Sequence, residues 1–104
     1  MKQFSLAILF FVSILMSVPS TETAAQTYCF GTVVGLSGRY DPSTGAGFLA
    51  MRAGPTSQAT QVGELFNGDV IKIVRQNGKW LLIINADDDS GWVYRRYVSH
   101  RCGF

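Results

Sequence analysis

The chain has 104 residues, which is enough for one small domain, and 15% of them are charged. The formal net charge is only +2 at pH 7, and no basic stripe of the kind that binds nucleic acid is present. With two cysteines and one histidine, the chain has too few of these ligands for a zinc site, so we expect no nucleic-acid partner, no metal and no cofactor.

The first 25 residues have the layout of a secretory signal peptide. Lys2 gives a positive start, an apolar run interrupted only by serines spans residues 4–18, and small residues follow at positions 23–25. We therefore predict a signal peptide over residues 1–25, with the mature protein beginning at Gln26. The alternative is an uncleaved membrane anchor, but a span needs about 20 apolar residues. Membrane contact is expected only during export, through the signal peptide.

The two cysteines flank the predicted mature domain. Cys29 lies near its start and Cys102 near its end, and export would place both in an oxidising compartment. We predict an intramolecular disulfide; two free thiols or an intermolecular bond are the alternatives. A lipoprotein anchor on Cys29 is disfavoured, because Gln-Thr-Tyr rather than small residues precedes it. The predicted location is periplasmic or secreted.

Short runs of β-forming residues alternate with turn signals along the mature chain. Strands are predicted at residues 26–36, 48–52, 70–76, 79–85 and 91–94 and in the second half of 58–65, and a 3₁₀ turn at 95–98. Asn67-Gly68 and Asn77-Gly78 mark tight hairpin turns. Residues 79–85 form the most apolar run and are predicted to be the central strand. This pattern indicates an all-β domain, and a small barrel is favoured because closure removes exposed edges.

The first predicted strand, residues 26–36, contains one phenylalanine and two glycines. Gly31 and Gly35 interrupt the strand, which predicts a bend or a bulge. Phe30, Phe48 and Phe66 are predicted to lie in the core or at its edge.

Residues 37–47, SGRYDPSTGAG, are predicted to form a long loop. Pro42 presets φ and Gly45 tolerates a positive φ, so this segment contains a strong turn signal. A connection of about eleven residues is long for so small a domain, and such loops are often functional or mobile.

Motifs in residues 47–104 occur in the order and spacing of the bacterial SH3 (SH3b) family. Leu49-Ala-Met-Arg-Ala-Gly-Pro55 resembles the element "LNVRSGPS", and Val62-Gly-Glu-Leu65 followed by Gly68 resembles "VIGTLKKG". Asn77-Gly-Lys-Trp80 resembles "NGWxxV" with an inserted Lys, and Gly91-Trp-Val93 with Tyr97-Val98 resembles "GWVxxxYL". The chain departs from the pattern at Ala50 and Met51 and in its longer 37–47 loop.

This resemblance implies an SH3-like barrel of about five to seven short strands over residues 26–104. SH3b domains often target enzymes to peptidoglycan, so it also implies a non-catalytic, exported binding module of the bacterial envelope. The expected partner is a cell-wall peptide or glycan, as in a peptidoglycan fragment, or an envelope protein. The alternative is an inhibitor or accessory subunit of a secreted or periplasmic enzyme, with the 37–47 loop as a wedge.

The resemblance also implies structural roles for three residues. Arg52 would tie the following turn by donating to backbone carbonyls, which suits the many donors of a guanidinium; a ligand contact is the alternative. Gly54 is expected to supply an unusual backbone angle, and Trp92 is expected to be structural.

The candidate ligand contacts are mainly aromatic. Trp80, Tyr94 and Tyr97 lie where an SH3-like barrel commonly presents aromatic side chains, Arg95 lies between two of them, and Tyr40 lies on the long loop. Stacking and charge-assisted hydrogen bonds would suit a glycan or a peptide. The alternative is that these rings merely cover the rim of the barrel.

No catalytic residues are predicted. His100 lies two residues from Cys102, but a cysteine in a disulfide is not a nucleophile, so a solvated tail is favoured. The run Asp87-Asp88-Asp89 invites a calcium site, which takes about six oxygen ligands. Consecutive side chains in a turn point in different directions, so a solvated turn is favoured.

Overall fold

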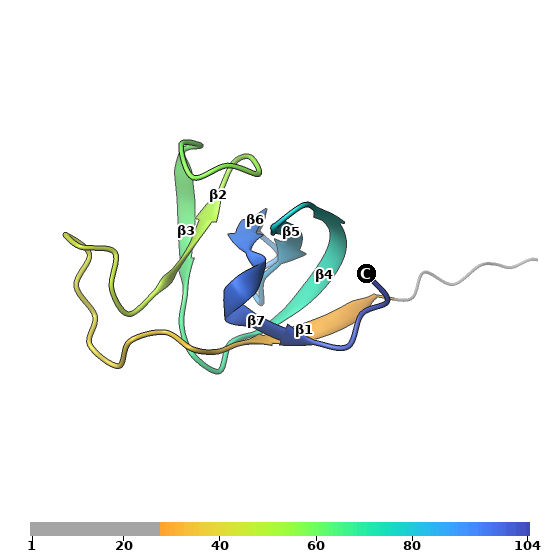
Figure 1. The fold of residues 1–104 in the computed structure, drawn as a ribbon, viewed down its shortest axis with the longest axis horizontal. Helices are drawn as coiled ribbons and strands as arrows, with labels where there is room; N and C mark the ends of the chain where they lie inside the picture. Colours follow the sequence, from red (N-terminus) through yellow and green to blue (C-terminus); the bar gives the residue numbers. More distant parts are fainter. Residues whose placement is uncertain (1–27) are drawn as a thin grey trace, which may run out of the picture.

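The computed structural model describes residues 28–104, which form one antiparallel sheet of seven strands. Figure 1 shows the strands curling into a barrel. Its elements are β1 (Cys29–Val33), β2 (Leu49–Arg52), β3 (Gln61–Leu65), β4 (Val70–Asn77), β5 (Trp80–Ile84), β6 (Ser90–Tyr94), the 3₁₀ turn η2 (Arg95–Tyr97) and β7 (Val98–His100). The predicted all-β class and SH3-like architecture are confirmed. The predicted signal peptide lies outside the described residues.

The strand order is β3-β2-β6-β5-β4-β1-β7. β5 is therefore the middle strand of the sheet, as the apolar run in residues 79–85 predicts. β1 pairs with β4 on one side and with β7 on the other, where Gly31 is opposite His100. The two ends of the described chain thus lie side by side (Figure 1). Within residues 28–104, no helix has the length and apolar character that a membrane span requires.

The core is formed by side chains that alternate along the strands. Ile71 and Ile73 of β4 and Leu81 and Ile83 of β5 are at most 2% exposed, whereas Val70 is 59% exposed. Successive side chains of a strand point to opposite faces, so in β4 Ile71 and Ile73 share the buried face and Val70 lies on the other. Both Asn-Gly turns are present, with φ of +93° at Gly68 and +63° at Gly78.

Gly31 does not form the predicted bulge. β1 pairs with β4 in unbroken register from Cys29 to Thr32. A Cβ at Gly31 would lie 2.8 Å from Val98 Cγ1 and 2.9 Å from Ile73 Cδ1. The glycine therefore permits a close approach of core side chains, and the bend lies later, at Gly35, where φ is +80°.

The prediction that Phe30 and Phe66 belong to the core is wrong. Phe30 is 56% exposed and Phe66 is 43% exposed, whereas Phe48 is 9% exposed. In β1 the inward positions are those of Gly31 and Val33, so Phe30 necessarily faces outward. Phe66 follows the end of β3 and begins the turn to β4.

Candidate binding groove

A groove on the surface of the barrel is lined by three of the predicted aromatic contacts, Trp80, Tyr94 and Tyr97. Its volume is about 840 Å³, which lies in the range of ligand sites. The rest of the lining comes from the 37–47 loop, Phe48, β2, the 53–60 loop and Gln61 at the start of β3. The β-strands thus supply one side of the groove and two loops flank it.

The aromatic side of the groove is held together by contacts between its rings. Trp80 of β5 is directly opposite Tyr94 of β6, and their ring centroids are 5.5 Å apart at 62°. The centroid of Tyr97, in η2, is 6.3 Å from that of Tyr94. Edge-on and tilted geometries of this kind are favourable for aromatic pairs. All three residues remain partly exposed, so their outer surfaces can meet a ligand.

Arg52 contacts both the loop beside the groove and the groove itself. Its Nη1 donates a hydrogen bond to the carbonyl of Ala59 at 2.9 Å, which ties the 53–60 loop to β2. Arg52 also lines the groove. The turn-tying role that the resemblance implies and the alternative of a ligand contact are therefore compatible in this geometry.

Trp92 packs as its expected structural role requires, whereas Gly54 does not have the expected backbone angle. Trp92 is 8% exposed, and the guanidinium carbon of Arg75 lies 5.4 Å from its ring centroid, so it packs as part of the framework. The expectation of an unusual backbone angle at Gly54 is wrong, because its φ is not positive. A Cβ there would lie 3.6 Å from the Ala59 Cβ, an ordinary contact.

Tyr40 lies outside the groove. Its hydroxyl donates to both carboxylate oxygens of Glu64, at 3.0 and 3.2 Å, and its ring centroid is 5.6 Å from Phe48 and 5.9 Å from Phe66. The hydrogen bond to Glu64 raises the pKa of the Tyr40 phenol. Tyr40 therefore contacts the groove only through Phe48, which lines it.

Residues 37–47 form a folded segment, called the arm below. The arm projects from the barrel at the left of Figure 1. The Asp41 carbonyl accepts hydrogen bonds from the N–H groups of Thr44, Gly45 and Ala46. The Asp41 carboxylate accepts from the N–H and the hydroxyl of Ser43, and these bonds lower the pKa of that carboxyl. The arm is thus organised by its own turn, and it contributes Pro42 and Gly45 to the groove.

Arg95 is brought near the groove but does not line it. Its N–H donates to the Lys79 carbonyl at 2.8 Å, which places these two basic residues next to the Trp80–Tyr94 pair. The guanidinium carbon of Arg96 lies 6.0 Å from the Tyr97 ring centroid. Three basic residues, Lys79, Arg95 and Arg96, thus adjoin the aromatic residues along the chain.

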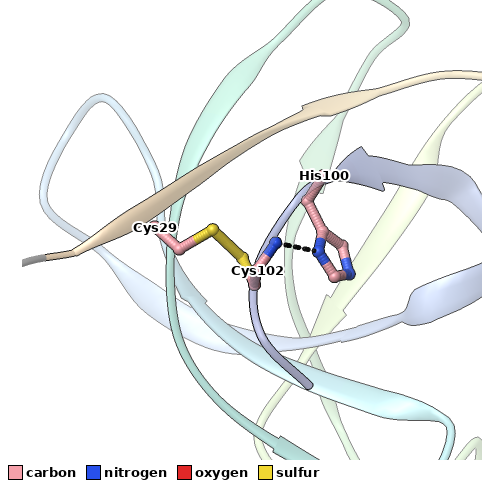
Figure 2. Close-up of side chains that lie close together, drawn as sticks. All are labelled: Cys29, His100 and Cys102. Atoms are coloured by element: carbon pink, nitrogen blue, oxygen red, sulfur yellow. Dashed lines mark hydrogen bonds between the residues drawn. A yellow bond between two sulfur atoms is a disulfide. The ribbon is translucent and has the colours of Figure 1, made fainter.

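The Cys29–Cys102 disulfide is confirmed, with the two Cα atoms 5.6 Å apart. The N–H of Cys102 donates to Nδ1 of His100 at 2.9 Å (Figure 2). The His nitrogen and the two sulfurs lie within 4.8 Å of one another. A cysteine acts as a nucleophile or metal ligand through its thiolate, so with the disulfide formed the two sulfurs serve neither role and instead tie β1 to the segment after β7.

The acidic turn between β5 and β6 is organised by Asn85. Its Oδ1 accepts hydrogen bonds from the N–H groups of Asp87 and Asp89, at 3.0 and 2.9 Å. Asp88 has a φ of +67°. This arrangement agrees with the solvated turn favoured from the sequence.

Sequence reasoning missed the polar side of the groove. Thr56, Ser57, Gln58 and Gln61 line it, but in the sequence they look like an ordinary turn leading into a strand. The available signal was their position in the segment that follows the "LNVR"-like element.

Comparison with known families gives one finding. The family model of the bacterial SH3 domain matches residues 47–99, just over half of the 104-residue chain. The arm up to Ala46 and β1 lie before the matched segment. A search of curated proteins finds no match.

Proposed function

Because this chain belongs to the bacterial SH3 domain family, whose members are generally non-catalytic binding modules, we propose that it is an exported binding module of the bacterial envelope. Family membership and the disulfide support a periplasmic or extracellular location. The proposed ligand is a cell-wall peptide or glycan within peptidoglycan, or an envelope protein.

The observation that carries this proposal is the groove. It combines three partly exposed aromatic side chains with a guanidinium and several hydroxyl and amide groups. Concave sites with an apolar surface and a few placed polar groups are typical of ligand binding. Rings that only covered the rim would not need a concave surface between two loops.

Binding to purified peptidoglycan tests the proposal. The wild-type protein should sediment with peptidoglycan at low salt, and Trp80→Ala should weaken the affinity by more than about 1 kcal/mol, the usual threshold for an interface residue that matters. Phe30→Ala is the matched control, because it removes an exposed aromatic ring from β1, which does not line the groove. A Trp80→Ala protein that binds as tightly as wild type would refute the groove as the site.

The second candidate is an inhibitor or accessory subunit of a secreted or periplasmic enzyme. It is favoured by the arm, which projects from the barrel and whose residues 37–46 lie before the matched segment. If the protein stays wholly soluble with peptidoglycan at low salt, wall binding fails and this candidate leads. Its own test is whether a change in the arm abolishes binding to a purified envelope enzyme.

A further inference from the structure

We propose that the groove recognises a peptide through a carboxylate and that Arg52 is the residue that receives it. This inference rests on the proposed function, since it takes the groove as the ligand site. It adds the chemical class of the ligand and the residue that selects it.

The first argument is the hydrogen bonding of Arg52. An arginine side chain is always charged and has a planar fork of donors that matches a carboxylate. Among the described residues, its guanidinium has one hydrogen-bond partner, the Ala59 carbonyl at 2.9 Å. That bond uses Nη1 and fixes the orientation of the group, so other N–H donors are held in place beside the groove.

The second argument is the charge of the groove. Arg52 is the only charged side chain among the described residues that line it. Neither Glu64 nor Asp41 lines the groove; their carboxylates accept hydrogen bonds from the hydroxyls of Tyr40 and Ser43. The groove lining thus offers Arg52 no anionic partner, and a ligand carboxylate would supply one. Hydrogen bonds between ionised groups are about twice as strong as those between neutral groups.

The third argument is the basic residues that adjoin the aromatic side of the groove. Lys79 and Arg95 are joined by a backbone hydrogen bond beside the Trp80–Tyr94 pair, and Arg96 lies over Tyr97. The acidic run at residues 87–89 is at the other end of β5 and β6, because Ile84 pairs with Ser90 there and Trp80 pairs with Tyr94 here. Cations next to the aromatic residues favour an anionic ligand over a cationic one.

The remaining lining favours a peptide over a glycan. Thr56, Ser57 and Gln58 bring hydroxyl and amide groups to the lining, which suits the alternating donors and acceptors of a peptide backbone. A neutral glycan has no group that needs a guanidinium. An acidic glycan would need it, and the experiment distinguishes this case.

The experiment selects binders from a random hexapeptide array with the exported protein, disulfide intact. The best binder is then remade with Asp and Glu replaced by Asn and Gln and with an amidated C-terminus, and dissociation constants are measured by fluorescence polarisation. We expect replacement of one carboxylate to weaken binding at least about tenfold, as charged hydrogen bonds do. Arg52→Gln should bind both peptide forms equally, and Lys72→Gln, a charge change on β4 away from the groove lining, should keep the difference.

Three outcomes would overturn this inference: no hexapeptide binder, no preference for carboxylates, or a preference that survives in Arg52→Gln. Binding of an acidic oligosaccharide such as oligogalacturonate, with the same dependence on Arg52, would overturn the assignment to a peptide. The comparison of peptide forms on the wild-type protein needs no variant, so it stands even if Arg52→Gln does not fold. Peptidoglycan binding that is sensitive to Trp80→Ala would still support the proposed function if the inference fails.

Discussion

Tyr40 illustrates, at the scale of one residue, what the sequence could and could not predict. Its place on a long loop made it a candidate ligand contact. Its actual partners, Phe48, Glu64 and Phe66, lie up to 26 positions later in the chain. No local pattern indicates which way the arm folds, because that is decided by packing between segments far apart in sequence. Trp80 and Tyr94 were easier to place, because cross-strand pairing brings them together.

The Tyr40–Glu64 hydrogen bond gives a prediction that can be measured directly. It raises the pKa of the Tyr40 phenol, so Glu64→Gln should lower that pKa toward the ordinary value of about 10. A raised pKa in the folded state stabilises the protein below the unfolded pKa, and this contribution is lost as the pH rises through the folded pKa. NMR titration of ¹³Cζ-labelled tyrosine would resolve Tyr40.

Asp87→Asn is the control for this titration. It also removes a carboxylate, but from the turn between β5 and β6, where the Asp87 N–H contacts Asn85. It should leave the Tyr40 pKa unchanged. A Tyr40 pKa that is the same in wild type and Glu64→Gln would show that the hydrogen bond does not form in solution.

At the scale of elements, a strand and its two faces can be predicted where apolar and polar side chains alternate along the sequence. In β4, Ile71 and Ile73 alternate with Lys72, so the sequence itself marks which side chains share a face. β1 was predicted as a strand, but not its inward face, because one inward position is Gly31, which has no side chain to mark it. A glycine is needed at this position because the side chains of Val98 and Ile73 occupy the space that a Cβ would fill. Both residues belong to other strands, so the sequence of β1 alone does not show this.

The arm depends on a glycine that composition alone does not single out. Gly45 and Gly47 have similar φ values, +81° and +84°. A Cβ at Gly45 would meet no heavy atom within 4 Å, whereas a Cβ at Gly47 would lie 2.5 Å from the Arg39 carbonyl oxygen and 2.6 Å from the Tyr40 Cα. Those neighbours are backbone atoms, so they cannot move without opening the arm.

We therefore predict different effects of two alanine substitutions that share the same backbone strain. Gly45→Ala should reduce the free energy of unfolding by about 1 kcal/mol, the cost of a left-handed conformation for a residue with a Cβ. Gly47→Ala should cost at least about 1 kcal/mol more, or should leave the barrel folded with the arm opened. Urea unfolding measures the first result, and amide exchange of the 41–46 turn detects the second. Equal behaviour of the two variants in both measurements would contradict this account of the arm.

At the scale of the whole molecule, the barrel extends beyond the segment that the family model matches. β1 precedes residue 47 but pairs with both β4 and β7. The motifs in residues 49–98 therefore identified the architecture, while the strand between β4 and β7 was predicted only from its β-forming composition. The cysteines supplied the other long-range information, because two cysteines permit a single intramolecular pairing.

The disulfide should contribute a large part of the stability of so small a domain. It links residues 73 positions apart, and by the chain-entropy model a loop of that size adds about 4 kcal/mol. Cys29→Ser combined with Cys102→Ser should lower the free energy of unfolding in urea by up to that amount, and reduction of the wild-type protein should have the same effect. The double variant treated with reductant is the control and should not change further. A wild-type protein whose unfolding midpoint is the same before and after reduction would show that β1 and β7 are held by strand pairing and core contacts alone.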